Sequence, residues 1–355
     1  MAMKLVLWGD GDSPHLLKWA RGLAAMPEIE LWAASSRGFL PGFDACVPAE
    51  RRLALNTNPQ TAGGNFGLLR QLPALVRWLK QVDAQWLHAH YLTSHGTLAW
   101  LARGVYGLRA QVVGSAWGSD ILDTPTHSTL MRVVTGRVLR ACALTTSDSQ
   151  VMAQRMRELG AREVMVFPFG LESMPAAAPD KDENLFFANR GLEPLYEPAR
   201  VLQQFAALAT PQSRLVVAND GSLRTQLEQQ AIHMGLQGQV QFVGRLDSAA
   251  QARCYDRARW YLSLPRTDSV SVSVLEAMAH GCVPILSDLA ANRELVHDGH
   301  NGLIVPAGQV LPAAALQAVL GQANAMAQRN RQWVAHNALF APSLAKFVTR
   351  LKALA

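Results

Sequence analysis

Residues 260–306 read WYLSLPRTDSVSVSVLEAMAHGCVPILSDLAANRELVHDGHNGLIVP. The segment opens with an apolar run that is long enough for a buried strand, and Pro265 ends the run because proline has no N–H to donate to a sheet. A helix is predicted over about 271–280, with Gly281 at its C-terminal cap. Residues 283–286 are predicted to form a second buried strand. The segment is therefore expected to be one β-α-β unit of a parallel sheet.

Two carboxylates flank the turn between the first strand and the helix. Asp268 precedes the helix, and Glu276 follows about one and a half turns into it. The N–H groups and the dipole at a helix start favour an anion. Carboxylates beside such a site suit a ligand that carries both hydroxyls and phosphate, such as a sugar nucleotide. The structural alternative is that Asp268 caps the helix and Glu276 is solvated, and spacing alone favours neither interpretation.

The segment resembles the donor-site signature of glycosyltransferase family 4. That signature is a carboxylate, seven residues and a glutamate in EAMA-x-G-x-P, followed by SD, N-x-E-x-V and NGLIVP. The matching positions here are Asp268, Glu276-Ala277-Met278-Ala279, Gly281, Pro284, Ser287-Asp288, Asn292, Glu294, Val296 and Asn301-Gly302. The resemblance implies that Asp268 contacts the donor sugar and that Glu276 binds the nucleotide ribose. The family usually has Glu at the first position, so Asp268 shortens the reach by one methylene.

Composition limits the protein class. The 355 residues are enough for two domains, and the 49% apolar content argues against disorder. No apolar run approaches the ~20 residues of a membrane span, and the amino terminus meets Asp10 too early to be a signal peptide. The cysteines form no C-x-x-C pair, so neither a zinc site nor a disulfide framework is expected and a reducing cytoplasm fits; they are Cys46, Cys142, Cys254 and Cys282.

The net charge of +6 limits the classes of binding partner that are expected. It is compatible with a phosphorylated substrate or with peripheral contact at the anionic inner face of a membrane. No Lys/Arg block or RNA-binding signature indicates nucleic acid, which is therefore not expected as a partner. A charged surface without any partner is the alternative.

Strands alternate with helices in the first half of the chain, which predicts a parallel sheet. The strands are expected at about 4–7, 30–35, 85–89 and 111–115. In such sheets ligands bind outside the carboxyl ends of the strands. The polar or aromatic residues that follow these ends are Asp10, Asp12, His15, His90, His95, Trp117 and Asp120. Asx-turns in a stiff loop and hydrogen-bonded scaffold histidines are the structural alternatives.

The family resemblance assigns this edge to the acceptor. The segment AWGSD, ending at Asp120, aligns with a family segment of the type HG-x-D, whose histidine lies near the reacting centre. Trp117 replaces that histidine and cannot relay a proton, although it could stack on a sugar ring. His90 or His95 is a candidate for the missing imidazole. Residues 168–172 resemble the family's interdomain hinge PNG-x-D, with Phe169 in place of Asn.

A second set of strand ends follows the hinge, at about 188, 218 and 243. Asn189-Arg190 resembles the start of the family's GRL-x-x-x-K element, in which Arg and Lys hold the donor diphosphate. Tyr196 stands at the lysine position, so Arg245 or Arg266 could supply the second cation. The residues expected to bind the donor besides Asp268, Glu276 and Arg190 are Tyr196, Asp220, Gly221, Gly244, Arg245, Ser269, Val270, Ser271 and Val272.

The resemblance implies an α/β protein of the GT-B fold, with two Rossmann-like domains whose parallel sheets face each other across a cleft. The acceptor domain is expected at 1–172, with a helix at about 341–355 crossing back onto it. A linker is expected at 173–183 and the donor domain at 184–340.

The implied function is transfer of a hexosyl unit, with retention at the anomeric carbon, from a nucleotide diphosphate sugar. The acceptor would be a glycan, a lipid-linked molecule or another hydroxyl compound, in polysaccharide or glycoconjugate synthesis. Arg190 and helix amides would stabilise the leaving group, so no cofactor or essential metal is expected. Three alternatives stay open: a sugar-nucleotide epimerase or hydrolase of the same fold, a catalytically weak partner subunit, and a dinucleotide-dependent oxidoreductase. The last lacks the glycine fingerprint G-x-G-x-x-G.

Overall fold

The computed structural model describes residues 2–57, 66–177 and 180–355. The chain divides into two compact units, Met1–Phe167 with Phe340–Ala355 (unit 1) and Pro168–Leu339 (unit 2). The boundary anticipated from sequence stood after residue 172, whereas unit 2 begins at Pro168. The anticipated linker, 173–183, runs into a strand that begins at Asp182.

Unit 1 is built on a parallel sheet with the strand order β3-β2-β1-β4-β5-β6-β7 over the described residues. The strands are β1 (Met3–Gly9), β2 (Ile29–Ser35), β3 (Arg52–Ala54), β4 (Trp86–His90), β5 (Gln111–Ser115), β6 (Leu144–Ser147) and β7 (Val164–Val166). The helices are α1 (Pro14–Ala24), α2 (Phe66–Arg70), α3 (Leu72–Val82), α4 (Thr97–Gly104), α5 (Ser119–Leu122), α6 (Thr124–His127), α7 (Thr129–Ala141), α8 (Gln150–Leu159) and α16 (Phe340–Leu354). The parallel α/β arrangement predicted from the alternation is confirmed.

Local sequence signals set several helix boundaries in unit 1. Ser13 caps α1 by accepting a hydrogen bond from the backbone N–H of His15, and Pro14 occupies the first helical position. Two short helices stand before β4, because α2 ends at Arg70 and α3 starts at Leu72. Pro73 lies at the start of α3, where its missing N–H cannot continue the hydrogen-bond ladder of the preceding turn.

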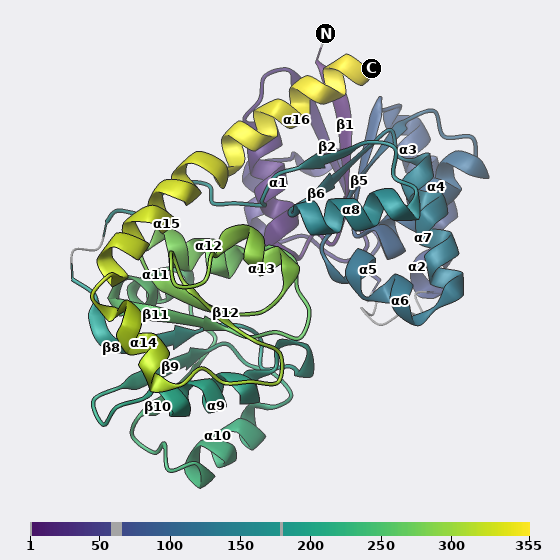
Figure 1. Ribbon diagram of the computed structural model, residues 1–355. Helices are drawn as coiled ribbons and strands as arrows, with labels where there is room; N and C mark the ends of the chain where they lie inside the picture. The colour runs from purple at the N-terminus through teal and green to yellow at the C-terminus, as the bar shows by residue number, and fades with distance from the viewer. Residues whose placement is uncertain (1, 58–65, 178–179) are drawn as a thin grey trace. The chain divides into compact units, whose positions relative to one another are not determined.

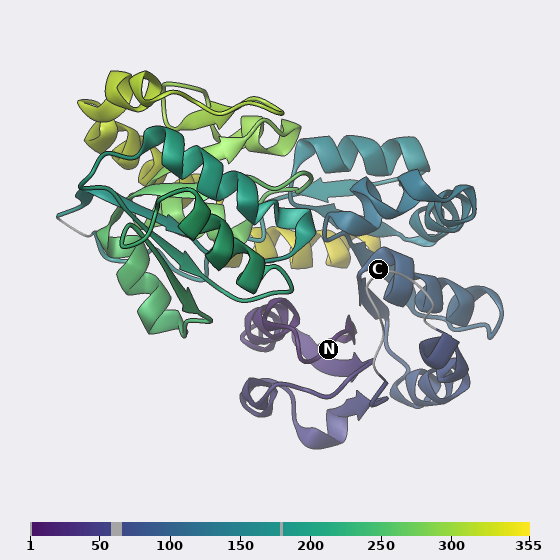
Figure 2. The same ribbon diagram turned by 90° about the horizontal axis from the view of Figure 1, so that it is seen from below.

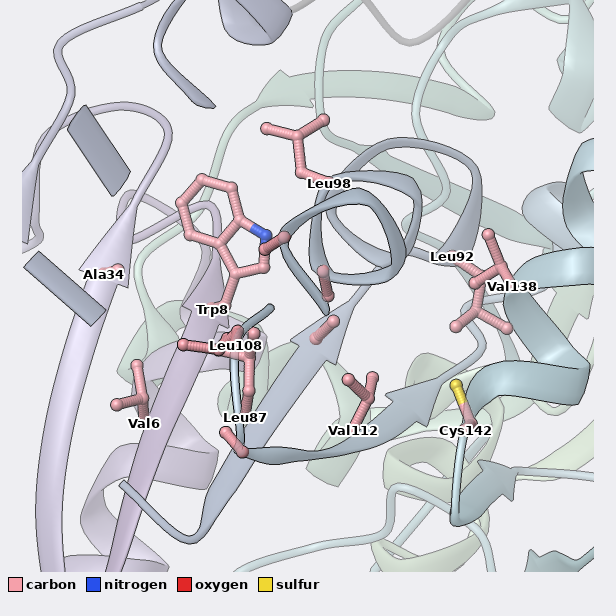
Figure 3. Close-up of a cluster of buried hydrophobic side chains, with 14 of the residues drawn as sticks. Val6, Trp8, Ala34, Leu87, Leu92, Leu98, Leu108, Val112, Val138 and Cys142 are labelled. Carbon is pink, nitrogen blue, oxygen red and sulfur yellow. The ribbon is translucent and has the colours of Figure 1, made fainter. Parts of the chain in front are cut away.

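The core of unit 1 forms where the helices cover the sheet (Figure 3). Val6 and Trp8 of β1, Leu87 of β4 and Val112 of β5 are buried together with side chains from the covering helices. The indole of Trp8 also has its N–H satisfied, by the backbone carbonyl of His95 at 3.0 Å. This contact ties the end of β1 to the turn that follows β4, and both belong to the carboxyl edge of the sheet.

Helix α16 completes unit 1 after the chain has passed through unit 2. It lies beside α1 (Figure 1), and the rings of Phe340 and Phe347 each lie with their centroids 5.1 Å from that of Trp19. Arg350 forms a two-pronged salt bridge with Glu163, with N–O distances of 2.6 and 2.7 Å. None of the helices within the described ranges has the length and apolarity needed to cross a bilayer.

Unit 2 is a second parallel sheet, with the strand order β10-β9-β8-β11-β12-β13 over the described residues. The strands are β8 (Asp182–Ala188), β9 (Arg214–Ala218), β10 (Val240–Gly244), β11 (Ala258–Ser263), β12 (Val283–Ser287) and β13 (Leu303–Val305). The helices are α9 (Pro198–Leu208), α10 (Arg224–His233), α11 (Ser248–Arg257), α12 (Val272–Ala279), α13 (Ala290–Leu295), α14 (Ala313–Leu320) and α15 (Ala323–Asn337).

Alternating side chains of the buried strands point to the two faces of this sheet. Phe186 and Trp260 join the apolar cluster under α9, α10 and α14, whereas Phe187 and Tyr261 join the cluster under α11, α12 and α15. Figure 1 shows the two sets of helices on opposite sides of the strands, and Figure 2, seen from below, brings α9 and α10 to the front. Two covered faces explain why the strands read as continuous apolar runs.

The β-α-β unit predicted from residues 260–286 is confirmed as β11, α12 and β12. Gly281 follows α12 with φ +82°, a left-handed conformation that glycine adopts without steric cost. The register of β11 against β8 and β12 brings the ends of β8 and β11 together at one edge of the sheet.

Candidate functional site

The side chain of Arg190 is the centre of a polar cluster at the carboxyl edge of unit 2. Arg190 follows β8, and its Nη2 lies 2.7 Å from Oδ2 of Asp268 in the loop after β11. Its Nη1 donates to the hydroxyl of Ser271 and, at 3.3 Å, to that of Ser273. The cation, the carboxylate and two hydroxyls from the start of α12 are thus brought together, although 78 residues separate Arg190 from Asp268.

Ser271 occupies the N-cap position of α12, where a serine side chain usually caps the helix. It is the residue before α12, yet its side chain makes no capping hydrogen bond to that helix. Its hydroxyl instead contacts Arg190 and lies 2.8 Å from Oγ of Ser273. Serines at a helix start usually accept from the helix amides, so this arrangement presents hydroxyls to the cation rather than to the backbone.

Tyr196 takes part in the cluster in a way that the sequence did not predict. It ends a short 3₁₀ turn, Pro194–Tyr196, and its ring lies 4.5 Å from the guanidinium carbon of Arg190. The sequence placed Tyr196 at the lysine position of the donor site. Its ring face supports the guanidinium through a cation–π contact, which helps to fix its plane.

Two opposing effects act on the pKa of the Asp268 carboxyl. Burial raises the pKa of Asp268, while the neighbouring Arg190 guanidinium and a hydrogen bond from the Ser269 N–H oppose the rise. The net pKa lies above the usual value for aspartate. Arg190 and Asp268 are each largely shielded from water. Each charge therefore compensates the desolvation of the other until a ligand replaces one of them.

Glu276 lies farther along α12, partly buried. Its Oε2 accepts hydrogen bonds from Gln251 at 3.2 Å and from the Tyr255 hydroxyl at 3.1 Å, both from α11. The solvated-helix alternative therefore does not describe this carboxylate. Gln251 and Tyr255 could not be predicted as partners from the sequence, because their approach depends on how α11 packs beside α12.

The other predicted donor-side residues surround this edge. Gly244 has φ +71° and its carbonyl accepts from the Asn219 N–H at 2.7 Å, while Arg245 is exposed. The side chain of Val270 packs into the core, so only its backbone can face a ligand. The remaining residues are Asp220, exposed with Oδ1 bound to the N–H of Gly221; Gly221, packed on the carbonyl of Leu192; Ser269, buried; and Val272, the first residue of α12.

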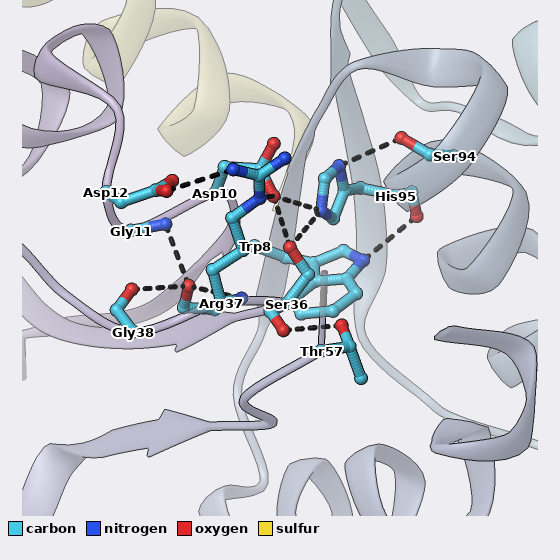
Figure 4. Close-up of polar contacts among 11 residues, drawn as sticks. Trp8, Asp10, Gly11, Asp12, Ser36, Arg37, Gly38, Thr57, Ser94 and His95 are labelled. Atoms are coloured by element: carbon cyan, nitrogen blue, oxygen red, sulfur yellow. Dashed lines mark hydrogen bonds and ion pairs between the residues drawn. The ribbon is translucent and has the colours of Figure 1, made fainter. Parts of the chain in front are cut away.

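A second polar cluster surrounds Asp10 in unit 1 (Figure 4). The carboxylate follows β1, accepts a hydrogen bond from Ser36, lies 3.4 Å from Nε2 of His95 and 3.9 Å from Nε of Arg37. Burial disfavours the charged form, but the His95 ring, the Ser36 hydroxyl and Arg37 together hold the pKa of Asp10 below its ordinary value. Asp12 pairs with Arg37 at 3.2 Å.

Sequence reasoning missed Ser36 and Arg37 in this cluster, although a signal for them existed. Both residues directly follow β2, as Asp10 follows β1. The rule that strand ends meet at one edge of a parallel sheet, applied to every strand, would have included them.

The structure distinguishes the two candidate imidazoles. His95 has both ring nitrogens engaged, Nδ1 with Ser94 and Nε2 with Ser36, each at 3.1 Å. His90 is buried next to Trp117, with ring centroids 5.8 Å apart, and neither of its nitrogens has a hydrogen-bond partner within the described residues. Burial and the neighbouring His88 hold the pKa of His90 well below its usual value, so its ring is neutral.

Trp117 and Asp120 have different surroundings, although they lie three residues apart. The Trp117 ring is partly exposed and lies 4.8 Å from the ring of His15. Asp120 is fully buried, and its two carboxylate oxygens accept the N–H groups of Leu92 and Trp117, each at 2.9 Å. Burial raises the pKa of Asp120 to about 6. These bonds give Asp120 a structural role in fixing two loops, rather than the ligand-facing position that its place in the sequence suggested.

The two parallel-sheet units, each with charged and hydroxyl-bearing side chains at the carboxyl ends of its strands, define the class of the protein as GT-B. The crystal structure of Anabaena Alr3699/HepE in complex with UDP is similar to this structure, with a TM-score of 0.77 at 16% sequence identity. The similarity covers 99% of this chain and 100% of that one. The predicted GT-B fold is therefore confirmed.

The family follows from the sequence itself. Residues 171–333 match the family Glycosyl transferases group 1, and residues 4–149 match the family Glycosyl transferase 4-like. Together the two matches cover both units, and the chain belongs to the glycosyltransferases of the family 4 type.

Two curated relatives are mannosyltransferases. A phosphatidyl-myo-inositol mannosyltransferase of Mycobacterium tuberculosis is 28% identical over 335 residues, covering 86% of this chain and 82% of that protein. A GDP-mannose:cellobiosyl-diphosphopolyprenol alpha-mannosyltransferase of Xanthomonas campestris is 32% identical over 146 residues. That second match spans only 39% of this chain and 36% of the relative.

Proposed function

We propose that this glycosyltransferase moves a hexosyl unit from a nucleotide diphosphate sugar to a hydroxyl group of its acceptor, with retention of configuration at the anomeric carbon. The observation that carries the proposal is the cluster at the start of α12. Arg190, Asp268 and the Ser271 hydroxyl meet there, and Glu276 lies on the same helix. A cation beside hydroxyls suits a diphosphate, and two carboxylates suit the hydroxyls of a sugar and a ribose.

Each residue then has a distinct role. The Arg190 guanidinium binds the diphosphate and stabilises the charge that develops on it as the glycosidic bond breaks. Asp268 turns from Arg190 to the sugar hydroxyls, and Glu276 accepts from the ribose hydroxyls. The protein contributes mainly position and electrostatics, so the reaction rate depends on how rigidly these groups are held.

A second part of the proposal is that catalysis needs no essential metal, because Arg190 stabilises the charge that develops on the leaving diphosphate. Chelation with EDTA is expected to leave turnover unchanged. A loss of activity that Mg²⁺ or Mn²⁺ restores would overturn this part without affecting the assignment of the donor cluster.

The relatives suggest which donor and acceptor to test first. One is named for GDP-mannose, and the acceptors in the names of both carry a lipid, either a diphosphopolyprenol or a phosphatidyl-myo-inositol. We therefore propose GDP-mannose as the first donor and a lipid-linked hydroxyl compound, in polysaccharide or glycoconjugate synthesis, as the acceptor.

Peripheral membrane contact through α7 would bring such an acceptor within reach. Leu130 and Val133 are 70% and 45% exposed, and Arg132 and Arg137 are exposed on the same helix. Apolar side chains flanked by arginines suit an anionic lipid surface. Leu130→Glu with Val133→Glu should abolish co-sedimentation with phosphatidylglycerol vesicles, whereas neutral phosphatidylcholine vesicles should bind neither variant nor parent; binding unchanged by the substitutions would refute this contact.

The decisive test of function is binding followed by product analysis. Thermal unfolding is recorded with GDP-mannose and with UDP-, ADP- and TDP-sugars, for the parent and for Glu276→Ala. A ligand at ~100 times its dissociation constant should stabilise the protein by about 2.7 kcal/mol. A shift with one donor that is lost in Glu276→Ala supports the proposal. The absence of any shift contradicts it.

Product analysis separates the remaining alternatives. A transferase forms a new glycoside only when an acceptor is added, and the anomeric proton coupling of the product tests retention. A hydrolase releases free sugar without acceptor, and an epimerase changes the sugar of the donor. A partner subunit binds the nucleotide sugar but turns over only when the second subunit is present.

A further inference from the structure

The carboxamide of Asn189 bridges two buried tyrosines of unit 2. Its Nδ2 donates to the Tyr255 hydroxyl at 2.8 Å, and its Oδ1 accepts from the Tyr261 hydroxyl at 2.7 Å. Asn189 and both rings are buried. Because a phenol hydroxyl can donate or accept, the orientation of this amide determines which way each of the two hydrogen bonds runs.

The hydrogen bonds of this bridge have a single direction. Burial raises the pKa of Tyr255 and Tyr261 well above the ordinary value, so both phenols keep their protons. With the Asn189 amide in the orientation seen here, Tyr261 donates to Oδ1, Nδ2 donates to Tyr255, and the Tyr255 proton is left for other acceptors. Those acceptors are Oε2 of Glu276 at 3.1 Å and the backbone carbonyl of Ser273 at 3.2 Å.

The bridge also connects the two ends of the donor cluster. The backbone of Asn189 leads directly into Arg190, and its carbonyl accepts from Asn219 at 3.4 Å. Its side chain acts through Tyr255 on Glu276. One residue therefore touches both the strand end that carries the cation and the hydrogen-bond chain that reaches the second carboxylate.

We propose that Asn189 is a positioning residue that orients Glu276 for the nucleotide. The proposal rests on the function proposed above, in which Glu276 binds the ribose. The amide presents its N–H side to Tyr255, so that the phenol proton is directed at Glu276 and holds one carboxylate oxygen. Glu276 is thereby held in the orientation in which it binds the ribose.

Because these hydrogen bonds run from Tyr261 to Glu276, a substitution at Tyr261 can test the proposal without changing a residue that binds the ligand. Tyr261→Phe removes a hydroxyl that donates to Asn189 and forms no hydrogen bond with Arg190 or Glu276. Asn189 Oδ1 then lacks its donor, and a flipped amide would offer that oxygen to Tyr255 and draw its proton away from Glu276. Affinity for GDP should fall roughly tenfold, as expected for a lost hydrogen bond to a charged group. Asn189→Ala should have a similar effect.

A double-mutant cycle with Glu276→Ala decides whether the effect passes through that carboxylate. GDP and UDP affinities are measured by calorimetry for the parent, Tyr261→Phe, Asn189→Ala, Glu276→Ala and the two double variants. Tyr106→Phe, an exposed tyrosine of unit 1, is the matched control and should change nothing.

Three outcomes are informative. If Tyr261→Phe and Asn189→Ala weaken binding in the parent but not in Glu276→Ala, the positioning role is supported. If their effects are the same in both backgrounds, the bridge only stabilises the unit and the inference is overturned, while the donor assignment stands. If the parent binds neither nucleotide, the proposed function fails and the inference fails with it.

Discussion

Arg190 and Asp268 form an ion pair, with 2.7 Å between Nη2 and Oδ2. The proposed function needs these two residues for different parts of one ligand, the diphosphate and the sugar. The N–H that Nη2 donates to Asp268 is not available to a phosphate, and in the proposed function Asp268 turns from Arg190 to the sugar when the donor binds. Breaking the ion pair adds a cost to binding that the phosphate charge must offset.

Asp268→Asn is therefore expected to separate nucleotide binding from turnover. The amide releases Arg190, so GDP without its sugar should bind at least as tightly as to the parent. Turnover should fall about 100-fold, because the sugar loses a charged partner. Calorimetry with GDP and initial rates with the identified donor check the two effects. Loss of GDP binding in Asp268→Asn would show that the carboxylate supports the cation instead of competing for it.

Tyr196 offers a test of how Arg190 is held. Because the ring face contacts the guanidinium, Tyr196→Phe should keep KM for the donor within about threefold of the parent value. Tyr196→Ala removes the ring that supports the Arg190 guanidinium, and it should raise KM for the donor roughly tenfold with a smaller change in kcat. Steady-state kinetics distinguish the cases. Equal effects of Phe and Ala would indicate that the hydroxyl, not the ring, is the important group.

His90 is expected to matter more than His95 for turnover, since its ring nitrogens are not already engaged by neighbouring side chains. His90→Ala should lower kcat by about 100-fold if the imidazole accepts an acceptor hydroxyl. His127→Ala, on the surface of the same unit, is the control. Burial keeps His90 neutral, so the parent rate should show no loss from this group as pH falls from 8 to 6. Unchanged kcat in His90→Ala would remove it from the acceptor site.

Helix α16 provides a prediction about stability. Phe347 is fully buried against Trp19, so Phe347→Ala should destabilise unit 1 by roughly 3–5 kcal/mol. The Arg350–Glu163 pair is partly exposed, so Arg350→Ala should destabilise unit 1 far less than Phe347→Ala does. Hydrogen exchange of α1 and α16 amides measures both. A larger loss in Arg350→Ala would mean that charge, not packing, holds the helix.

The same salt bridge has a defined pH dependence. Hydrogen bonds from Arg350 hold the pKa of Glu163 below its ordinary value of 4.5, so the pair stabilises unit 1 above that value and loses its effect as pH falls below it. The difference in α16 protection between the parent and Arg350→Ala should therefore disappear at acidic pH. A difference that persists at pH 3 would contradict this assignment.

Much of the fold could be predicted because its signals are local. The apolar runs of β11 and β12, the position of Gly281 and the serine before α1 each depend on a few neighbouring residues. The start of α3 at Leu72 has a local signal too, since Pro73 stands in its first turn.

The partners of the site residues could not be predicted in the same way. Asp268 and Glu276 lie at a loop and a helix whose type the sequence indicated, but Arg190, Tyr255 and Asn189 reach them through packing across the sheet. Asp120 was misjudged for a related reason. A strand end places a residue at the ligand edge, but it does not determine whether the side chain turns outward or back onto the loop amides.

The return of the chain to unit 1 affects the order in which the protein matures on the ribosome. Unit 2 is continuous in sequence, so all of its strands and helices have been synthesised before residue 340 emerges. Unit 1 still lacks α16 at that moment, and Trp19 remains without the aromatic rings of Phe340 and Phe347. The part of the chain made first is therefore the part completed last, and a nascent chain stalled after unit 2 would expose that apolar surface to chaperones.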